Sequence, residues 1–97
     1  MLDKIPFEEF EAIVGQTVRV SSQSDHIDVE VKEAHRLANP SPRAEAPFAV
    51  VVRENGASRS AGQGVYRLDH PTLGMMDLLF VPIGPDGKGM CYEVTFN

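Results

Sequence analysis

The chain has 97 residues, of which 42% are hydrophobic and 24% carry a charge, a balance typical of one small globular domain. Its 14 acidic residues outnumber its 9 Lys and Arg residues, so the net charge is -5. Because phosphate backbones and anionic lipid surfaces attract proteins with a surplus of basic side chains, this balance argues against a nucleic-acid partner and against a membrane partner.

The first predicted element is a short helix over residues 6–14. Pro6 suits the first helical position, and Gly15 suits the position where the helix ends. One face of this helix is apolar and consists of Phe7, Phe10, Ile13 and Val14. A helix this short is not stable alone, so we expect it to dock on the strands, where it would plug one end or one open side.

Six β-strands are predicted downstream, over residues 17–22, 27–33, 48–53, 64–69, 75–83 and 90–96. The alternation of apolar and polar residues is clearest in 27–33, and it favours a hairpin of 17–22 with 27–33 that has one solvated face. The intervening segments 34–47 and 54–62 contain mostly turn-forming residues and are predicted to be loops.

Residues 75–83 are apolar at nearly every position, a pattern typical of a strand that is covered on both faces. Pro71 cannot donate a ladder hydrogen bond and Gly74 can adopt a positive φ, so the corner between them separates this strand from 64–69. We expect the other strands to pack around this pair. The N-terminal helix or a second copy of the chain would supply the second cover.

These elements predict an all-β fold, mainly antiparallel, with one short N-terminal α-helix. Six strands of this length form either a small barrel or a two-sheet sandwich. A barrel leaves no exposed sheet edge, which suits a small chain. We expect residues 1–97 to form a single domain.

Three ordered motifs resemble a family of small bacterial domains of about this length whose function is unassigned. They are QGVYRLDHPTLG (Gln63–Gly74), FVPIGPDGKG (Phe80–Gly89) and YEVTFN (Tyr92–Asn97), and the opening FEEFEAIVGQTVRV (Phe7–Val20) resembles the start of the same family. The resemblance implies no activity and no site residue for this chain. An association of such genes with phage-tail-like genes implies a role as an assembly module.

Asp69, His70 and Cys91 are the residue types of a Cys–His–Asp nucleophile system. Asp69 and His70 are neighbours on a predicted strand, however, so their side chains point to opposite faces. We interpret His70 as a corner residue that bonds the backbone and Cys91 as a packed thiol. We therefore predict no catalytic residues and no enzymatic activity.

The three histidines, His26, His35 and His70, lack the HxH or HxxxH spacing of a metal site. The glycine-rich turns lack the order of a phosphate-binding loop. We expect no metal and no cofactor. The single cysteine excludes an intrachain disulfide and favours the reducing cytoplasm. We also expect no signal peptide and no transmembrane helix, because no apolar run is long enough.

The function that this pattern favours is a non-catalytic protein-interaction or assembly module, part of a phage-tail-like or other multiprotein particle. Its partner would be another protein or a second copy of the chain. The predicted interaction patch is apolar and consists of Leu73, Met75, Met76, Leu78 and Phe80.

The alternative is a small-ligand-binding β-barrel that uses the barrel mouth as a cleft. Arg36, Arg43 and Arg59 lie in or beside the predicted loops and would hold an anionic group there. A pocket with apolar walls and a converging arginine would favour this hypothesis, and a filled barrel interior would count against it.

Overall fold

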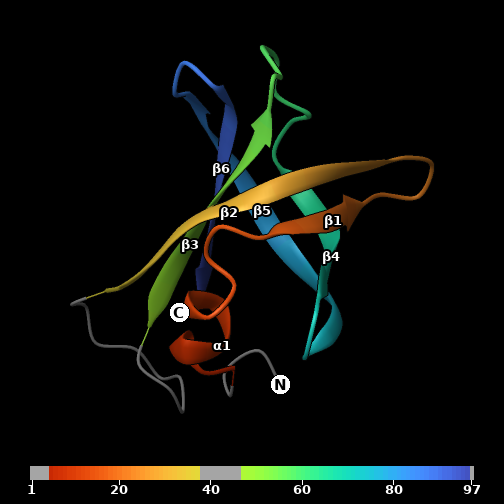
Figure 1. The fold of residues 1–97 in the computed structure, drawn as a ribbon. Helices are drawn as coiled ribbons and strands as arrows, with labels where there is room; N and C mark the ends of the chain where they lie inside the picture. The colour runs from red at the N-terminus through yellow and green to blue at the C-terminus, as the bar shows by residue number, and fades with distance from the viewer. Residues whose placement is uncertain (1–4, 38–46, 97) are drawn as a thin grey trace.

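Six antiparallel strands close into a barrel in the computed structural model, which describes residues 5–37 and 47–96 (Figure 1). The elements in chain order are α1 (Phe7–Glu11), β1 (Thr17–Ser21), β2 (His26–Arg36), β3 (Phe48–Asn55), β4 (Gly64–His70), β5 (Gly74–Pro85) and β6 (Gly89–Phe96). The predicted all-β class with one short helix is confirmed, and the barrel is the form that is observed.

The observed bounds differ from the predicted ones by one to a few residues in every element, and the largest differences are in the helix and in β2. The helix ends at Glu11 and continues as a turn over residues 12–15, where Gly15 has φ 93°. Strand β2 extends to Arg36, into the predicted loop, because its partner β3 pairs with it as far as Phe48. Most of the remaining predicted loop, including Arg43, lies outside the described residues.

The strand order around the barrel is β1-β2-β3-β6-β5-β4, with β4 pairing back to β1. The β3–β6 ladder runs from Phe48↔Phe96 to Asn55↔Gly89. The β1–β4 ladder, which closes the barrel, comprises only Val20↔Leu68 and Ser21↔Arg67. The barrel is therefore closed by its shortest ladder, between two strands that a hairpin does not join.

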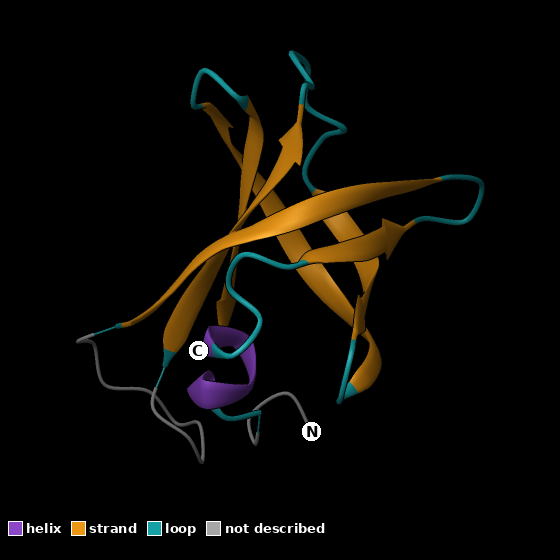
Figure 2. Ribbon diagram, viewed as in Figure 1, coloured by secondary structure: helices purple, strands orange, loops and turns teal. Residues whose placement is uncertain are grey.

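Helix α1 lies across one end of the barrel (Figure 2). Its Phe10 is buried, with its ring centroid 5.2 Å from that of Phe96 and 6.1 Å from that of Phe48. Phe48 and Phe96 stack on each other at 4.5 Å, and Phe7 meets Phe48 edge to face. The helix thus plugs this end with aromatic side chains, which is one of the two placements that its apolar face predicts.

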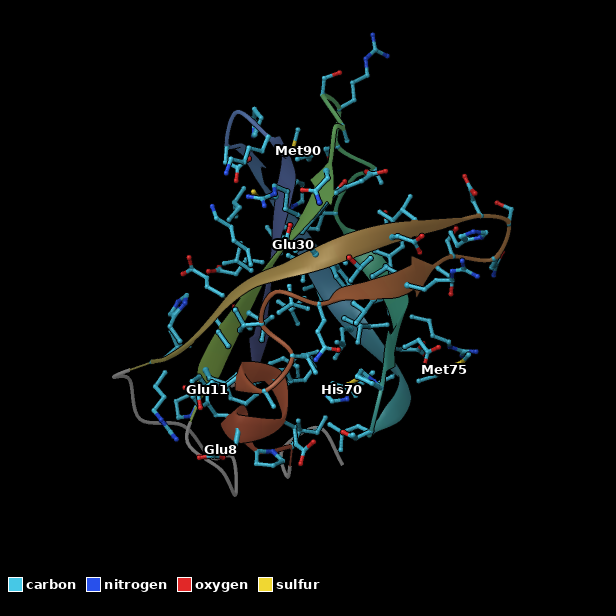
Figure 3. All side chains as sticks on the ribbon, viewed as in Figure 1. Glu8, Glu11, Glu30, His70, Met75 and Met90 are labelled. Atoms are coloured by element: carbon cyan, nitrogen blue, oxygen red, sulfur yellow. The ribbon has the colours of Figure 1, made fainter. Side chains whose placement is uncertain are left out.

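His70 ties the helix to the β4–β5 corner, and Figure 3 shows it between α1 and the strands. Its Nε2 donates to the carbonyl oxygen of Glu9 at 2.8 Å, and its Nδ1 accepts the backbone N–H groups of Thr72 and Leu73 at 3.1 and 3.2 Å. A carbonyl only accepts and an amide N–H only donates, so the proton resides on Nε2. His70 is therefore a backbone-bonding corner residue, as expected.

Replacing His70 by Ala removes one donor and one acceptor from a buried site and leaves the Glu9 carbonyl and two N–H groups without their partner. We expect the free energy of unfolding to fall by about 2–4 kcal/mol. Urea denaturation followed by circular dichroism measures this loss. The exposed His35→Ala change is the control, expected within ~0.5 kcal/mol of wild type; equal losses in both variants would contradict the role of His70.

Gly89 begins β6 opposite Asn55, at the end of the β3–β6 ladder. A Cβ atom at this position would overlap the backbone carbonyl of Glu54. A backbone contact cannot be relieved by a change of rotamer, so only glycine fits here.

We expect Gly89→Ala to lower the free energy of unfolding by about 1–3 kcal/mol, because the β3–β6 ladder must shift. Gly64→Ala is a matched control in another strand, since its Cβ would meet the Tyr66 ring at an ordinary 3.6 Å. That change should cost less than ~0.5 kcal/mol. Thermal melts of the two variants test the difference, and a Gly89→Ala protein as stable as Gly64→Ala would refute the close approach.

Candidate functional site

Most of the large exposed hydrophobic side chains of the described residues lie on one hairpin. Of six such side chains, five belong to the β4–β5 hairpin and one, Val14, follows the helix. The five are Val65, Leu73, Met75, Leu79 and Ile83. Leu73 lies in the turn, whereas the other four lie on the strands; we call Val65, Met75, Leu79 and Ile83 the outer apolar face.

Two members of the outer apolar face are paired directly across the strands. Val65 on β4 is opposite Leu79 on β5, and their exposed fractions are 65% and 50%. Met75, which is 66% exposed, projects away from the barrel in Figure 3. Apolar side chains from both strands thus lie on the same outward side of the hairpin, with charged residues between them.

An ion pair lies in the middle of this face. Arg67 and Asp77 are opposite each other in the β4–β5 ladder, between the Val65↔Leu79 pair and Met75. The Arg67 Nε donates to Asp77 Oδ1 at 3.0 Å, and both side chains are more than half exposed. The hydrogen bond to Asp77 raises the pKa of Arg67. Asp69, which is exposed opposite Met75, adds a second carboxyl group on this side of the hairpin.

The predicted interaction patch mixes the two faces of β5. Leu78 and Phe80 are buried and point into the barrel, and Met76 is partly buried against the core. Only Leu73 and Met75 of that set are well exposed. Of the two covers expected for the second face of β5, the helix does not supply it, because α1 plugs the barrel end. The second copy of the chain stays a prediction.

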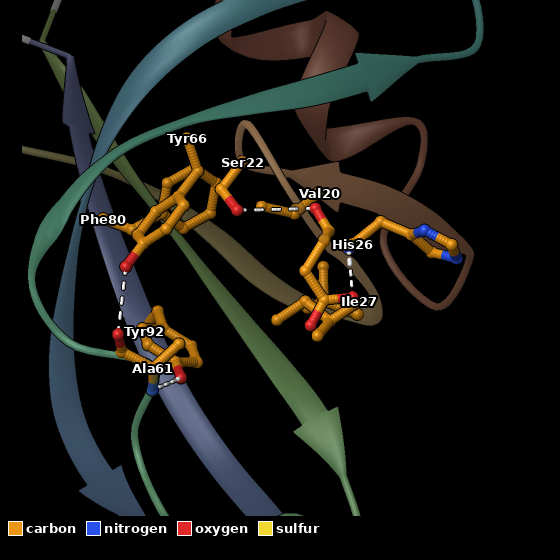
Figure 4. Close-up of a pocket in the computed structure, with 10 residues that line it drawn as sticks. Val20, Ser22, His26, Ile27, Ala61, Tyr66, Phe80 and Tyr92 are labelled. Carbon is orange, nitrogen blue, oxygen red and sulfur yellow. Dashed lines mark hydrogen bonds between the residues drawn. The ribbon is translucent and has the colours of Figure 1, made fainter.

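The opposite end of the barrel from α1 contains a cavity of about 220 Å³ (Figure 4). The aromatic rings of Tyr66, Phe80 and Tyr92 form one side. The aliphatic residues Val20, Ile27 and Val29, from β1 and β2, also line it. The remaining lining residues are Ser22, Asp25, His26 and Ala61.

The tips of the two tyrosines are bonded to the loop between β3 and β4. The N–H of Ala61 donates to Tyr92 Oη at 2.7 Å. The Tyr66 hydroxyl donates to the backbone carbonyl groups of these loop residues, and its oxygen lies 3.0 Å from that of Gly62 and 3.1 Å from that of Ala61. The loop therefore holds both rings at the cavity wall.

The structure does not gather the predicted anion-holding arginines. Arg36 Nη2 donates to Glu8 Oε2 at 2.8 Å, and its guanidinium lies 4.4 Å from the centre of the Phe7 ring, at the helix end of the barrel. Arg59 is exposed in the β3–β4 loop and does not line the cavity, and Arg43 lies outside the described residues. The cavity walls carry no arginine in the part of the chain that the structure describes.

A polar cluster on the barrel exterior was not foreseen from the sequence. Arg53 on β3 donates to Asp86 Oδ2 at 2.7 Å and to Glu30 Oε1 at 3.0 Å, and Lys32 Nζ lies 3.2 Å from the same Asp86 oxygen. The contact between Glu30 and Arg53 follows from the register, because the two residues are paired in the β2–β3 ladder. The contact to Asp86 spans 33 positions in sequence, and only the strand order reveals it.

Hydrogen bonds from Arg53 and from the N–H of Lys88 hold the pKa of Asp86 well below its ordinary value of 3.8. Burial, followed by the charge of Asp86, raises the pKa of the Cys91 thiol. The thiol is thus protonated and a poor nucleophile at neutral pH. His70 is bonded to Glu9 and the corner backbone, so the candidate nucleophile system is not assembled.

Because the pKa values of Asp86 and Glu30 are lowered by folding, their stabilisation is present at neutral pH and is lost as pH falls below the ordinary values of 3.8 and 4.5. We expect Asp86→Asn to melt at lower temperature at pH 7 and to depend less steeply on pH in acid. Asp28→Asn, at an exposed pair with Arg19, should resemble wild type. Parallel acid melting profiles of the two variants would disprove this.

Among the described residues, no three His, Cys, Asp or Glu side chains are grouped so that they could hold a metal ion. No helix in residues 5–37 or 47–96 is long and apolar enough to cross a bilayer.

Comparison with known proteins places the chain in a family without assigning an activity. No curated protein and no solved structure matches it significantly. Residues 5–96, nearly the whole chain, match the family model described as a domain of unknown function, DUF6916. The chain therefore belongs to the DUF6916 family, in agreement with its resemblance to a family of small uncharacterised domains.

Proposed function

We propose that this chain is a non-catalytic assembly module that associates with a second copy of itself through the outer apolar face. The observation that carries the proposal is the concentration of exposed apolar side chains on one hairpin of the barrel. A group of exposed apolar side chains on one side of a small domain is typical of a protein-interaction site.

The contrast with the β1–β2 hairpin supports this reading. Both hairpins turn one face outward, yet the exposed positions of β1 and β2 are mostly polar or charged, as in the Arg19–Asp28 pair. The corresponding positions of β4 and β5 include Val65 and Leu79, directly opposite each other. The apolar character is therefore specific to one side of the barrel.

The charges on this face favour a second copy as the partner. The chain as a whole carries a net charge of -5, so contact between two arbitrary faces would bring like charges together. The outer apolar face carries one Arg67–Asp77 pair at its centre. A two-fold axis through this pair would place Arg67 of each copy near Asp77 of the other, which makes the face self-complementary.

A non-catalytic role agrees with the remaining chemistry of the barrel. His70 is engaged with the helix and Cys91 has a raised pKa. Association through β4 and β5 leaves the plugged end and the cavity end of each barrel free. Those ends are then available for further contacts in a larger particle, such as a phage-tail-like one.

Leu79→Glu places a carboxylate on the outer apolar face, opposite Val65, without touching the barrel interior. We expect it to weaken self-association at least tenfold, or about 1.4 kcal/mol, because the charge would be buried in the dimer. Analytical ultracentrifugation over a range of concentrations measures this, with wild type expected to move from monomer toward dimer.

Val14→Glu is the matched control, since Val14 is an exposed apolar residue outside the face and the substitution adds the same charge. It should associate like wild type, and both variants should melt cooperatively near the wild-type temperature. A wild-type chain that stays monomeric up to millimolar concentration would overturn the proposal. Equal weakening by both substitutions would overturn the assignment of this face.

A further inference from the structure

We propose that the cavity at the barrel mouth binds a small aromatic amine, with the ring inside the cavity and the ammonium group at Asp25. This inference is independent of the proposed self-association. The cavity is lined by inward-facing residues such as Phe80 and Val29, whereas the outer apolar face lies on the exterior of β4 and β5.

The aromatic wall favours a flat ring as the ligand. Tyr66 meets Phe80 edge to face with 5.8 Å between centroids, and Phe80 meets Tyr92 at 6.5 Å in the same manner. Figure 4 shows these rings on one side of the hollow and Val20 and Ile27 on the other. Such a wall offers ring faces and edges to an aromatic guest, and ring faces also attract a cation.

The wall is organised before any ligand arrives. Both tyrosine hydroxyl groups are bonded to the backbone of residues 61–62, so a ligand need not immobilise the rings. The loss of side-chain freedom on binding is therefore small. The other end of the barrel is plugged by Phe10, and the two ends thus differ in whether the described residues fill them.

The volume limits the ligand to one ring with a short substituent. An apolar cavity of about 150 Å³ accommodates benzene, and this one has about 220 Å³. Ser22 and Asp25 are exposed residues of the lining, so the cavity opens to solvent beside the β1–β2 turn. A two-carbon chain on the ring would reach that opening.

The charged side chains at the opening favour a ligand that carries an ammonium group. Asp25 and His26 are the ionisable rim residues, and neither lysine nor arginine belongs to the described lining. Asp25 Oδ1 accepts the backbone N–H of His26 at 2.8 Å, which fixes the carboxylate at the rim while its second oxygen can accept from a ligand. An anionic ligand, as expected from the arginines of the sequence, would meet this carboxylate unfavourably.

Three probes of similar size separate the contribution of the aromatic ring from that of the charge. They are 2-phenylethylamine, 2-cyclohexylethylamine and 3-phenylpropanoate. We expect 2-phenylethylamine to produce saturable amide shifts at Ser22–Val29 and Ala61 in ¹H–¹⁵N NMR titrations of the full chain. The aliphatic amine should bind more weakly than 2-phenylethylamine. The aromatic carboxylate should bind more weakly by a factor of about ten or more.

Asp25→Asn keeps an oxygen for the His26 N–H and removes only the charge. It should weaken binding of 2-phenylethylamine about fivefold or more and leave binding of the neutral 2-phenylethanol unchanged. Asp28→Asn removes the same charge from the same hairpin outside the cavity lining, and should bind the amine as wild type does.

Three results would overturn the inference. The first is a lack of saturable shifts with 2-phenylethylamine at about 10 mM, well above a Kd of 1 mM. The second is binding of 3-phenylpropanoate as tight as that of the amine. The third is equal weakening by Asp25→Asn and Asp28→Asn, which would indicate a general charge effect rather than a contact.

Discussion

Burial of Phe10 against the aromatic rings at one barrel end is the contact on which the N-terminal half of the structure depends. The ring centroids of His70, Phe96 and Phe48 lie 4.9, 5.2 and 6.1 Å from that of Phe10. A five-residue helix has no independent stability, so this burial and the His70–Glu9 hydrogen bond hold it in place. The helix, the corner after β4 and the ends of β3 and β6 are thereby coupled.

When the barrel closes, one face of each strand becomes interior and the other face stays on the exterior. On the β2–β3 side the exterior is held by Arg53, which joins Glu30 to Asp86 in the turn before β6. Among the described residues, the β4–β5 side shows no comparable network and carries apolar side chains around an exposed ion pair, Arg67–Asp77. This difference between two sides of one barrel is the reason for proposing β4–β5 as the contact surface for a second copy.

The two barrel ends also differ in the side chains that lie there. Phenylalanines fill the helix end, whereas the mouth is lined by Tyr66 and Tyr92, whose hydroxyl groups are occupied by the loop at Ala61. Tyrosine can line a cavity that reaches solvent because its polar tip is satisfied while its ring remains apolar. The described residues thus form an ordered lining around the hollow without filling it, which is the property that a binding site requires.

The sequence by itself determined the local features: the strands, the short helix, the corner at Pro71 and Gly74, and a backbone-bonded His70, because periodicity and turn chemistry act over a few residues. The tertiary structure decided which side chains of β5 are covered. Residues 75–83 are apolar at nearly every position, yet Phe80 is inside and Leu79 outside, and apolar character alone does not distinguish the two. It also decided the contacts of Arg53 with Asp86 and of Ala61 with Tyr92. These join residues more than 30 positions apart, and only the strand order brings them together.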